Sequence, residues 1–304
     1  MSAVDVCSNR GKMNESTIAA RGREIDVLAV GFPTCSLGER VLPVASLPIA
    51  PPVHLLVDAV TASLSAHRTL LLVLPSWADE PARGRIATVR ALRGTDRMLT
   101  YSSALPPLAG GILAVLAGQL AARVNTPDEL LAALPVLERE MTVLAWLRSV
   151  TGLERPAPSM AQHLRSHAPG AAFAVVLNGS RSGVHTLGKK RSRPNLPKRD
   201  GSVGVAVADS GADLDWLRTT CQRWVPDADV HRIQPSPLAT RYWGSAPHAE
   251  AVVFPVDLDL VLSASRKRSD PAEPCRWCGE AVTSSTCPFC GSVQKSALRE
   301  GARS

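Results

Sequence analysis

The sequence predicts an α/β protein in which an N-terminal three-layer unit with a parallel sheet is followed by a second, smaller α/β unit and a short cysteine-rich segment. Three observations support this fold class. Short, continuous apolar runs alternate with segments whose apolar residues recur at helical spacing. The hydrophobic fraction of 45% and the charged fraction of 20% are those of a globular protein. The 304 residues suffice for two ordinary domains and a small one.

Strands and helices are expected to alternate through the first unit, which we place at residues 23–152. Residues 25–31, IDVLAVG, form a continuous aliphatic run that ends at glycine, as a buried strand does. The elements predicted after it are a helix at 53–67, a strand at 69–77, a helix at 81–94, a strand at 97–103 and a helix at 107–123. This order is typical of a parallel sheet covered by helices on both faces.

A long helix is expected to close the first unit. The segment TPDE at 126–129 is a capping box with proline at the first helical position, and an apolar stripe continues from there to Leu144. We place the end of this helix at Gly152. The uncharged run at 98–122 is interrupted by prolines at 106 and 107, so the helix that remains is too short to favour a membrane span.

The second unit is placed at residues 160–264. It is predicted to contain strands at 171–179 and 202–210, a helix at 212–225 with a capping box from Ser210 to Asp213, a short strand DVHRI, and an apolar run over 249–264. Residues 1–22 are expected to be disordered, 265–274 to form a polar linker and 292–304 to form a tail. Because residues 1–22 hold no apolar stretch, they do not resemble a secretory signal, and we expect a cytoplasmic protein with reduced thiols.

Four of the seven cysteines lie within the segment CRWCGEAVTSSTCPFCG, which we assign to residues 275–291. It contains two Cys-x-x-Cys-Gly units with eight residues between the second and third cysteines, and such a layout suits a tetrahedral site with metal–sulfur distances of about 2.3 Å. The segment resembles the small zinc-ribbon family, whose pattern is C-x-x-C-G, a short hairpin and C-P-x-C-G. One structural Zn²⁺ is therefore expected on Cys275, Cys278, Cys287 and Cys290. Two disulfides or four unrelated thiols are the alternatives.

A basic loop at 181–199 interrupts the second unit. It holds seven basic residues and no acidic one, whereas the remaining 27 basic residues of the chain equal its 27 acidic residues. Flexible cationic side chains are suited to phosphate contact, although a solvated loop without a partner has the same composition. A second basic cluster stands before the cysteine-rich segment. The candidate nucleic-acid-binding residues are Arg181, Lys189, Lys190, Arg191, Arg193, Lys198, Arg199, Arg266, Lys267 and Arg268.

Candidate catalytic chemistry is sparse, and we name no catalytic residue. In a parallel sheet, ligands bind beyond the carboxyl ends of the strands, which here carry FPTCS at 32–36, PSWADE at 75–80 and YSS at 101–103. Cys35 could be a nucleophile there, but no histidine stands in the same segments, which favours a surface or packed thiol. Asp257 and Asp259 alternate, as two carboxylates on one face of a strand do. No phosphate-binding glycine motif is complete.

Three function hypotheses follow from these patterns. The first is a cytoplasmic, non-enzymatic zinc-ribbon accessory protein that binds nucleic acid electrostatically. The second is a protein-interaction scaffold that uses the ribbon to hold a protein partner. The third is a hydrolase or transferase with a site at the strand ends of the first unit.

Overall fold

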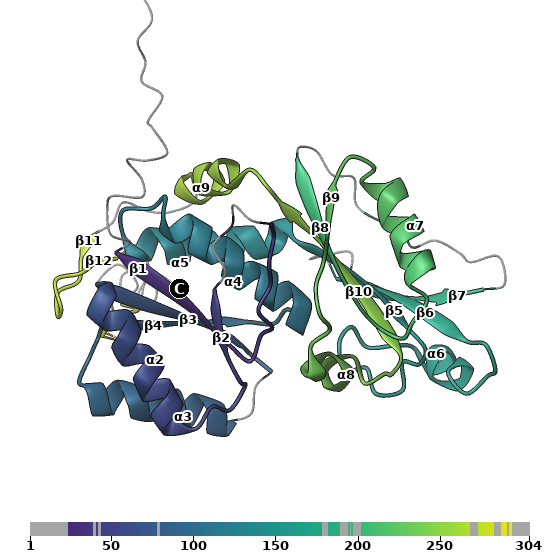
Figure 1. Cartoon of the computed structure of the whole chain (residues 1–304), viewed down its shortest axis with the longest axis horizontal. Coiled ribbons are helices and arrows are strands. Elements are labelled where there is room, and N and C mark those ends of the chain that lie inside the picture. Colours follow the sequence, from purple (N-terminus) through teal and green to yellow (C-terminus); the bar gives the residue numbers. More distant parts are fainter. Residues whose placement is uncertain are drawn as a thin grey trace, which may run out of the picture.

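The computed structural model describes residues 24–38, 41, 44–77, 80–177, 182–188, 194, 196, 202–267, 273–282, 287–290 and 292–293. Within these residues the chain forms a parallel four-stranded sheet, a mixed six-stranded sheet and a two-stranded ribbon. Figure 1 shows the first unit in purple and blue, the second in green and the ribbon in yellow. The α/β fold class predicted from the sequence is confirmed.

The first sheet has the strand order β2-β1-β3-β4, and all of its strands are parallel. Helices α2 and α3 cover one face, where Leu56 and Val89 are buried, and α4 covers the other. This sheet therefore forms the central layer of a three-layer unit. Its elements are β1 (Ile25–Val30), β2 (Ala45–Leu47), α2 (Val53–Ala66), β3 (Thr69–Pro75), α3 (Glu80–Arg93), β4 (Met98–Ser103) and α4 (Pro107–Ala121).

The second sheet has the order β7-β6-β5-β10-β8-β9, with β8 and β9 parallel and the other neighbours antiparallel. Helix α7 packs on one face, and α4, α5 and α8 pack toward the other. Its elements, with those that flank it, are α5 (Pro127–Glu140), β5 (Thr142–Leu147), α6 (Met160–Arg165), β6 (Ala172–Leu177), β7 (Gly183–Leu187), β8 (Val203–Ser210), α7 (Leu214–Trp224), β9 (Asp229–Arg232), α8 (Pro237–Trp243), β10 (His248–Pro255) and α9 (Leu258–Arg266).

Helix α4 joins the two units, because it contacts β1 of the first sheet and β10 of the second. Its sequence, PLAGGILAVLAGQLA, carries no charge, and its residues are buried on all sides except at Gly118 and Gln119. A helix that is apolar all round is stable only when it is enclosed. One continuous core therefore runs from the first sheet through α4 to the second. No helix of the described residues is both long enough and apolar enough to cross a membrane.

The prediction of a long helix that runs through Leu144 to Gly152 is wrong. Thr126 caps α5 as predicted, by accepting a hydrogen bond from the backbone N–H of Glu129 at 3.2 Å, but the helix ends at Glu140. Residues 142–147 then form β5, which pairs with β10 and β6. Apolar residues on both sides of β5 are buried between helices, so their pattern fits helical spacing as well as strand alternation.

Two local predictions in the second unit also need correction. The N-cap of α7 is Asp213, whose carboxylate accepts the N–H of Trp216 at 2.9 Å, rather than Ser210. Asp257 and Asp259 do not lie on a strand. Asp257 caps α9 by accepting the N–H groups of Asp259 and Leu260, because β10 has already ended at Pro255.

The cysteine-rich segment forms a hairpin of β11 (Glu273–Pro274) and β12 (Ala281–Val282). Val282 and Phe289 are buried and belong to the main core. The guanidinium of Arg90, in the last turn of α3, donates to the backbone carbonyl of Phe289. The ribbon is therefore packed against the first unit rather than held only by its linker.

Candidate functional site

The carboxyl ends of β1 and β3 meet at the point where the strand order of the first sheet reverses. From β1 the chain passes to β2 on one side and then to β3 on the other. Such a switch point is where open parallel sheets bind ligands. The loops that follow these strands carry Phe32 and Cys35 after β1 and Trp77 after β3. The strand ends named from the sequence are thus brought together.

A row of aromatic side chains crosses from this switch point into the second unit. The ring centroids of Phe32 and Trp77 are 6.3 Å apart, those of Trp77 and Tyr242 5.4 Å, and those of Tyr242 and Trp243 5.0 Å. The Trp77 indole donates to the carbonyl of Leu105 at 3.0 Å. Four of the twelve aromatic residues of the chain therefore gather at one place. We define the junction cluster as Phe32, Cys35, Trp77, Tyr242, Trp243 and Glu250.

Two glycines of α4 allow the loop after β1 to rest directly on the helix. A Cβ atom at Gly110 would overlap the ring of Phe32, and one at Gly111 would lie 2.6 Å from the carbonyl oxygen of Pro33. Any other residue at these positions would therefore push the loop away. The first turns of α4 and the loop after β1 form one wall of the junction cluster.

Glu250 is the buried polar group of this cluster. It lies on β10, and its side chain is fully buried on the face that packs toward α4. Its Oε2 atom accepts a hydrogen bond from the Trp243 indole at 3.0 Å, whereas its Oε1 atom has no hydrogen-bond partner. Burial raises the pKa of the Glu250 carboxyl to about 7, and contacts with the Trp243 indole and the backbone of Leu108 oppose this shift.

The nearby thiol and phenol are held protonated. Burial, followed by the charge of Glu250, raises the pKa of Cys35 to about 12 and that of Tyr242 to about 12. The Cys35 thiol donates weakly to the Pro33 carbonyl, at 3.6 Å. Of the two alternatives to a nucleophile, a surface thiol and a packed thiol, the structure shows the packed one, because Cys35 is buried. Its raised pKa is opposite to the lowered pKa that a nucleophilic cysteine needs.

Two other buried titratable side chains lie in the core. His248 stands on the same strand as Glu250, with its Nδ1 atom 3.1 Å from the Ser245 carbonyl oxygen, and burial lowers its pKa. Burial raises the pKa of Glu138, on α5, while hydrogen bonds from Ser103 and Tyr101 lower it.

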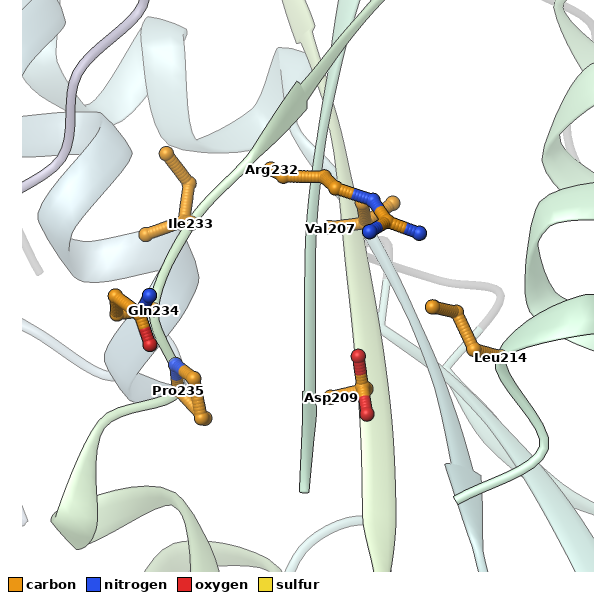
Figure 2. Close-up of a pocket in the computed structure, with 7 residues that line it drawn as sticks. All are labelled: Val207, Asp209, Leu214, Arg232, Ile233, Gln234 and Pro235. Atoms are coloured by element: carbon orange, nitrogen blue, oxygen red, sulfur yellow. The ribbon is translucent and has the colours of Figure 1, made fainter. Parts of the chain in front are cut away.

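Open pockets lie elsewhere: one of about 470 Å³ lies at the ends of α2 and α3, and two smaller ones lie beside α7 on the opposite face of the second sheet. Figure 2 shows one of about 210 Å³, in which the side chains of Arg232 and Asp209 stand over β8 and β9. Another of about 220 Å³ adjoins Cys221 and shares Val207 with the first. These two pockets bring together few side chains that could act as acids, bases or nucleophiles. The residues that line the pocket in Figure 2 are Val207, Asp209, Leu214, Arg232, Ile233, Gln234 and Pro235.

The four ribbon cysteines meet, as the sequence predicted. Their sulfur atoms all lie within 4.8 Å of one another, with 3.7 Å between Cys275 and Cys290 and 3.6 Å between Cys278 and Cys287. Gly279 has φ +78°, which closes the first turn, and the Trp277 N–H points at the Cys275 sulfur at 3.5 Å. The geometry suits a metal ion held by four thiolates.

The predicted phosphate-contacting residues do not form a site within the described residues. Arg266 is bound to Glu129 through two nitrogens, at 2.6 and 2.7 Å, and Lys267 follows the end of α9. A cation already paired with a carboxylate is less available to phosphate. The remaining candidates, Arg181, Lys189, Lys190, Arg191, Arg193, Lys198, Arg199 and Arg268, lie outside the described residues.

No protein-family model and no curated protein match the sequence. Solved structures do match the fold. A DegV family protein from Corynebacterium glutamicum aligns over 77% of this chain and 98% of its own, with 12% identity and a TM-score of 0.54. A fatty-acid-binding DegV family protein from Thermus thermophilus covers 77% and 100%, with 12% identity and a TM-score of 0.55. A Thermotoga maritima protein described as having a fatty acid binding function covers 77% and 100%, with 11% identity and a TM-score of 0.53.

These likenesses correct the functional prediction. Over most of its length the chain has a fold whose solved examples are described as binding fatty acids. The prediction of a nucleic-acid-binding accessory protein, with nucleic acid or a ribbon-bound protein as its partner, is wrong, because solved proteins with this fold are described as binding fatty acids. At 11–12% identity the comparisons establish the architecture. The chain has the two-domain α/β fold of the DegV proteins.

Proposed function

We propose that this protein binds a long-chain acyl lipid at the junction cluster. The observation that carries the proposal is the pairing of two α/β units around one apolar helix, in the fold of proteins from Thermus thermophilus and Thermotoga maritima that are described as binding fatty acids. The cluster stands at the switch point of the parallel sheet, where this architecture places ligands.

The side chains of the junction suit an acyl chain. Helix α4 offers apolar atoms and small residues, and the aromatic row offers flat apolar surfaces without charge. Burying each methylene group of a lipid contributes about 0.8 kcal/mol, so a long chain binds without an ion pair. Entry requires that the Phe32 ring and the loop after β1 move from the Gly110 and Gly111 backbone, on which they rest.

Lipid extraction and titration test the proposal. Protein purified without detergent is extracted with organic solvent, and the extract is analysed by mass spectrometry for acyl lipids near one per chain. The delipidated protein is then titrated with a fluorescent acyl probe. Absence of both a co-purified acyl lipid and saturable binding would contradict the proposal.

Tryptophan variants locate the site. Trp77 belongs to the junction cluster, whereas Trp277 is 82% exposed on the ribbon and serves as the matched control. We expect lipid to change the tryptophan fluorescence of wild type and of Trp277→Phe equally, and to change that of Trp77→Phe less, since Trp243 is then the remaining tryptophan of the junction cluster. An equal change in all three proteins would place the lipid elsewhere.

We also propose that Cys275, Cys278, Cys287 and Cys290 hold one structural zinc ion. The proposal is supported by the four sulfur atoms, which already lie within 4.8 Å of one another on a ribbon that packs against the first unit. Four thiolates leave no open position, so the ion would stabilise the ribbon and take no part in lipid chemistry. Elemental analysis of folded protein tests this, with one zinc per chain expected.

A further inference from the structure

We infer that Glu250 makes the junction cluster select acyl lipids with an uncharged head group, such as an alcohol or an ester, over lipids that end in a carboxylate. The inference rests on the proposed function, because it assumes that an acyl lipid enters the cluster. It adds the chemical class of the head group and identifies Glu250 as the residue that contacts it.

Strand alternation places the Glu250 carboxyl in a space bounded by small side chains. On β10, Val252 and Phe254 share its face and lie in the core around α4, whereas Ala249, Ala251 and Val253 pack toward α7. The residues in register with Glu250 on the neighbouring strands are Ala145 of β5 and Ala208 of β8. The neighbouring strands therefore place methyl groups, and no polar side chain, beside the carboxyl group.

The unpartnered oxygen is the feature that points to a ligand. The Trp243 indole donates to Oε2 and the Leu108 backbone contacts the carboxyl group, whereas Oε1 is fully buried and has no hydrogen bond of normal geometry. Leaving a buried acceptor unpaired costs roughly 1–3 kcal/mol. A hydroxyl group of a lipid can donate a hydrogen bond to Oε1, and an ester carbonyl can accept a hydrogen bond from the neutral carboxyl group. Either contact would remove this penalty.

The junction cluster around Glu250 holds no lysine or arginine side chain, although the charge of Arg155 reaches the Tyr242 phenol and opposes the rise in its pKa that burial causes. No lysine or arginine among the described residues forms an ion pair with Glu250. The Cys35 thiol and the Tyr242 phenol face it, and both are protonated because burial raises their pKa values to about 12. His248, two residues before Glu250 on the same face of β10, is also buried, and burial lowers its pKa and so favours the neutral imidazole. Helix α4 carries no charged side chain. Two carboxyl groups in such a site must share one proton.

A matched pair of ligands tests the inference. Monoolein and oleate carry the same acyl chain, and their affinities for delipidated wild type, Glu250→Gln and Glu138→Gln are measured by isothermal titration at about pH 6 and about pH 8. We expect wild type to bind monoolein at least about tenfold more tightly than oleate at the higher pH, since one pKa unit corresponds to a tenfold ratio. Glu250→Gln should bring the two affinities within about threefold, by strengthening oleate binding.

The control variant and the two pH values distinguish a failure of the head-group inference from a failure of the proposed lipid binding. Glu138 is a buried acid hydrogen-bonded to Ser103 and Tyr101, so Glu138→Gln should keep the wild-type preference. If Glu250→Gln does not fold, the wild type alone decides, because oleate affinity should fall from the lower to the higher pH while monoolein affinity stays constant. Equal binding of oleate and monoolein at the higher pH would overturn this inference. Binding of neither ligand would overturn the proposed function itself.

Discussion

Replacement of Glu250 by glutamine tests whether this carboxyl group is neutral inside the folded protein. Burial of the side chain raises its pKa from 4.5 to about 7. Between these values the unfolded chain has lost the proton and the folded protein retains it, so the free energy of unfolding falls as the pH rises. One pKa unit corresponds to about 1.4 kcal/mol, and the shift therefore removes about 3 kcal/mol of stability between about pH 4.5 and pH 7.

Glu250→Gln should abolish this loss, because an amide does not titrate. We expect the stability of the variant relative to wild type to increase by up to about 3 kcal/mol as the pH is raised through this window. Urea unfolding, followed by circular dichroism at closely spaced pH values, measures the difference. The lowered pKa of His248 affects both proteins alike and cancels.

The control is Asp58→Asn, which removes an exposed carboxyl group on α2. We expect its stability relative to wild type to change little over the same pH range. A difference between Glu250→Gln and wild type that stayed constant with pH would refute the reasoning, since it would mean that Glu250 is charged in the folded protein.

The remaining predictions concern the ribbon, the α4 contact and a helix cap. Cys278→Ser should lower zinc to well under one per chain and expose the ribbon to limited proteolysis, whereas Trp277→Ala should leave the zinc content unchanged. Gly110→Ala should destabilise the protein by about 1–3 kcal/mol through its clash with Phe32, and the same change should have a much smaller effect in a Phe32→Ala background, as thermal unfolding of the four proteins would show. Asp213→Ala removes the N-cap of α7 and should lower the free energy of unfolding by about 1 kcal/mol. Asp215→Ala, in the first turn of the same helix, should lower it less, and urea unfolding of both variants measures the difference.

The sequence by itself determined most of the first unit and the ribbon ligands. Strands β1 and β3 were predictable because a fully buried parallel strand is a continuous apolar run, and α2 and α3 because their buried residues recur at helical spacing. The cysteine spacing was sufficient to predict that four sulfur atoms meet, since a Cys-x-x-Cys turn brings two thiols together locally.

Only the tertiary structure decided β5 and the junction cluster. Residues 142–147 fit either secondary structure, and pairing with β10, more than a hundred residues later, makes them a strand. In the sequence, Glu250 is one polar residue within an apolar segment, and nothing marks it as part of a site. Trp77 and Tyr242, whose rings are in contact, are 165 positions apart. Their contact, and the unpaired oxygen beside it, depend on how two sheets close around α4. That closure depends on packing between distant segments, which no local pattern of residues encodes.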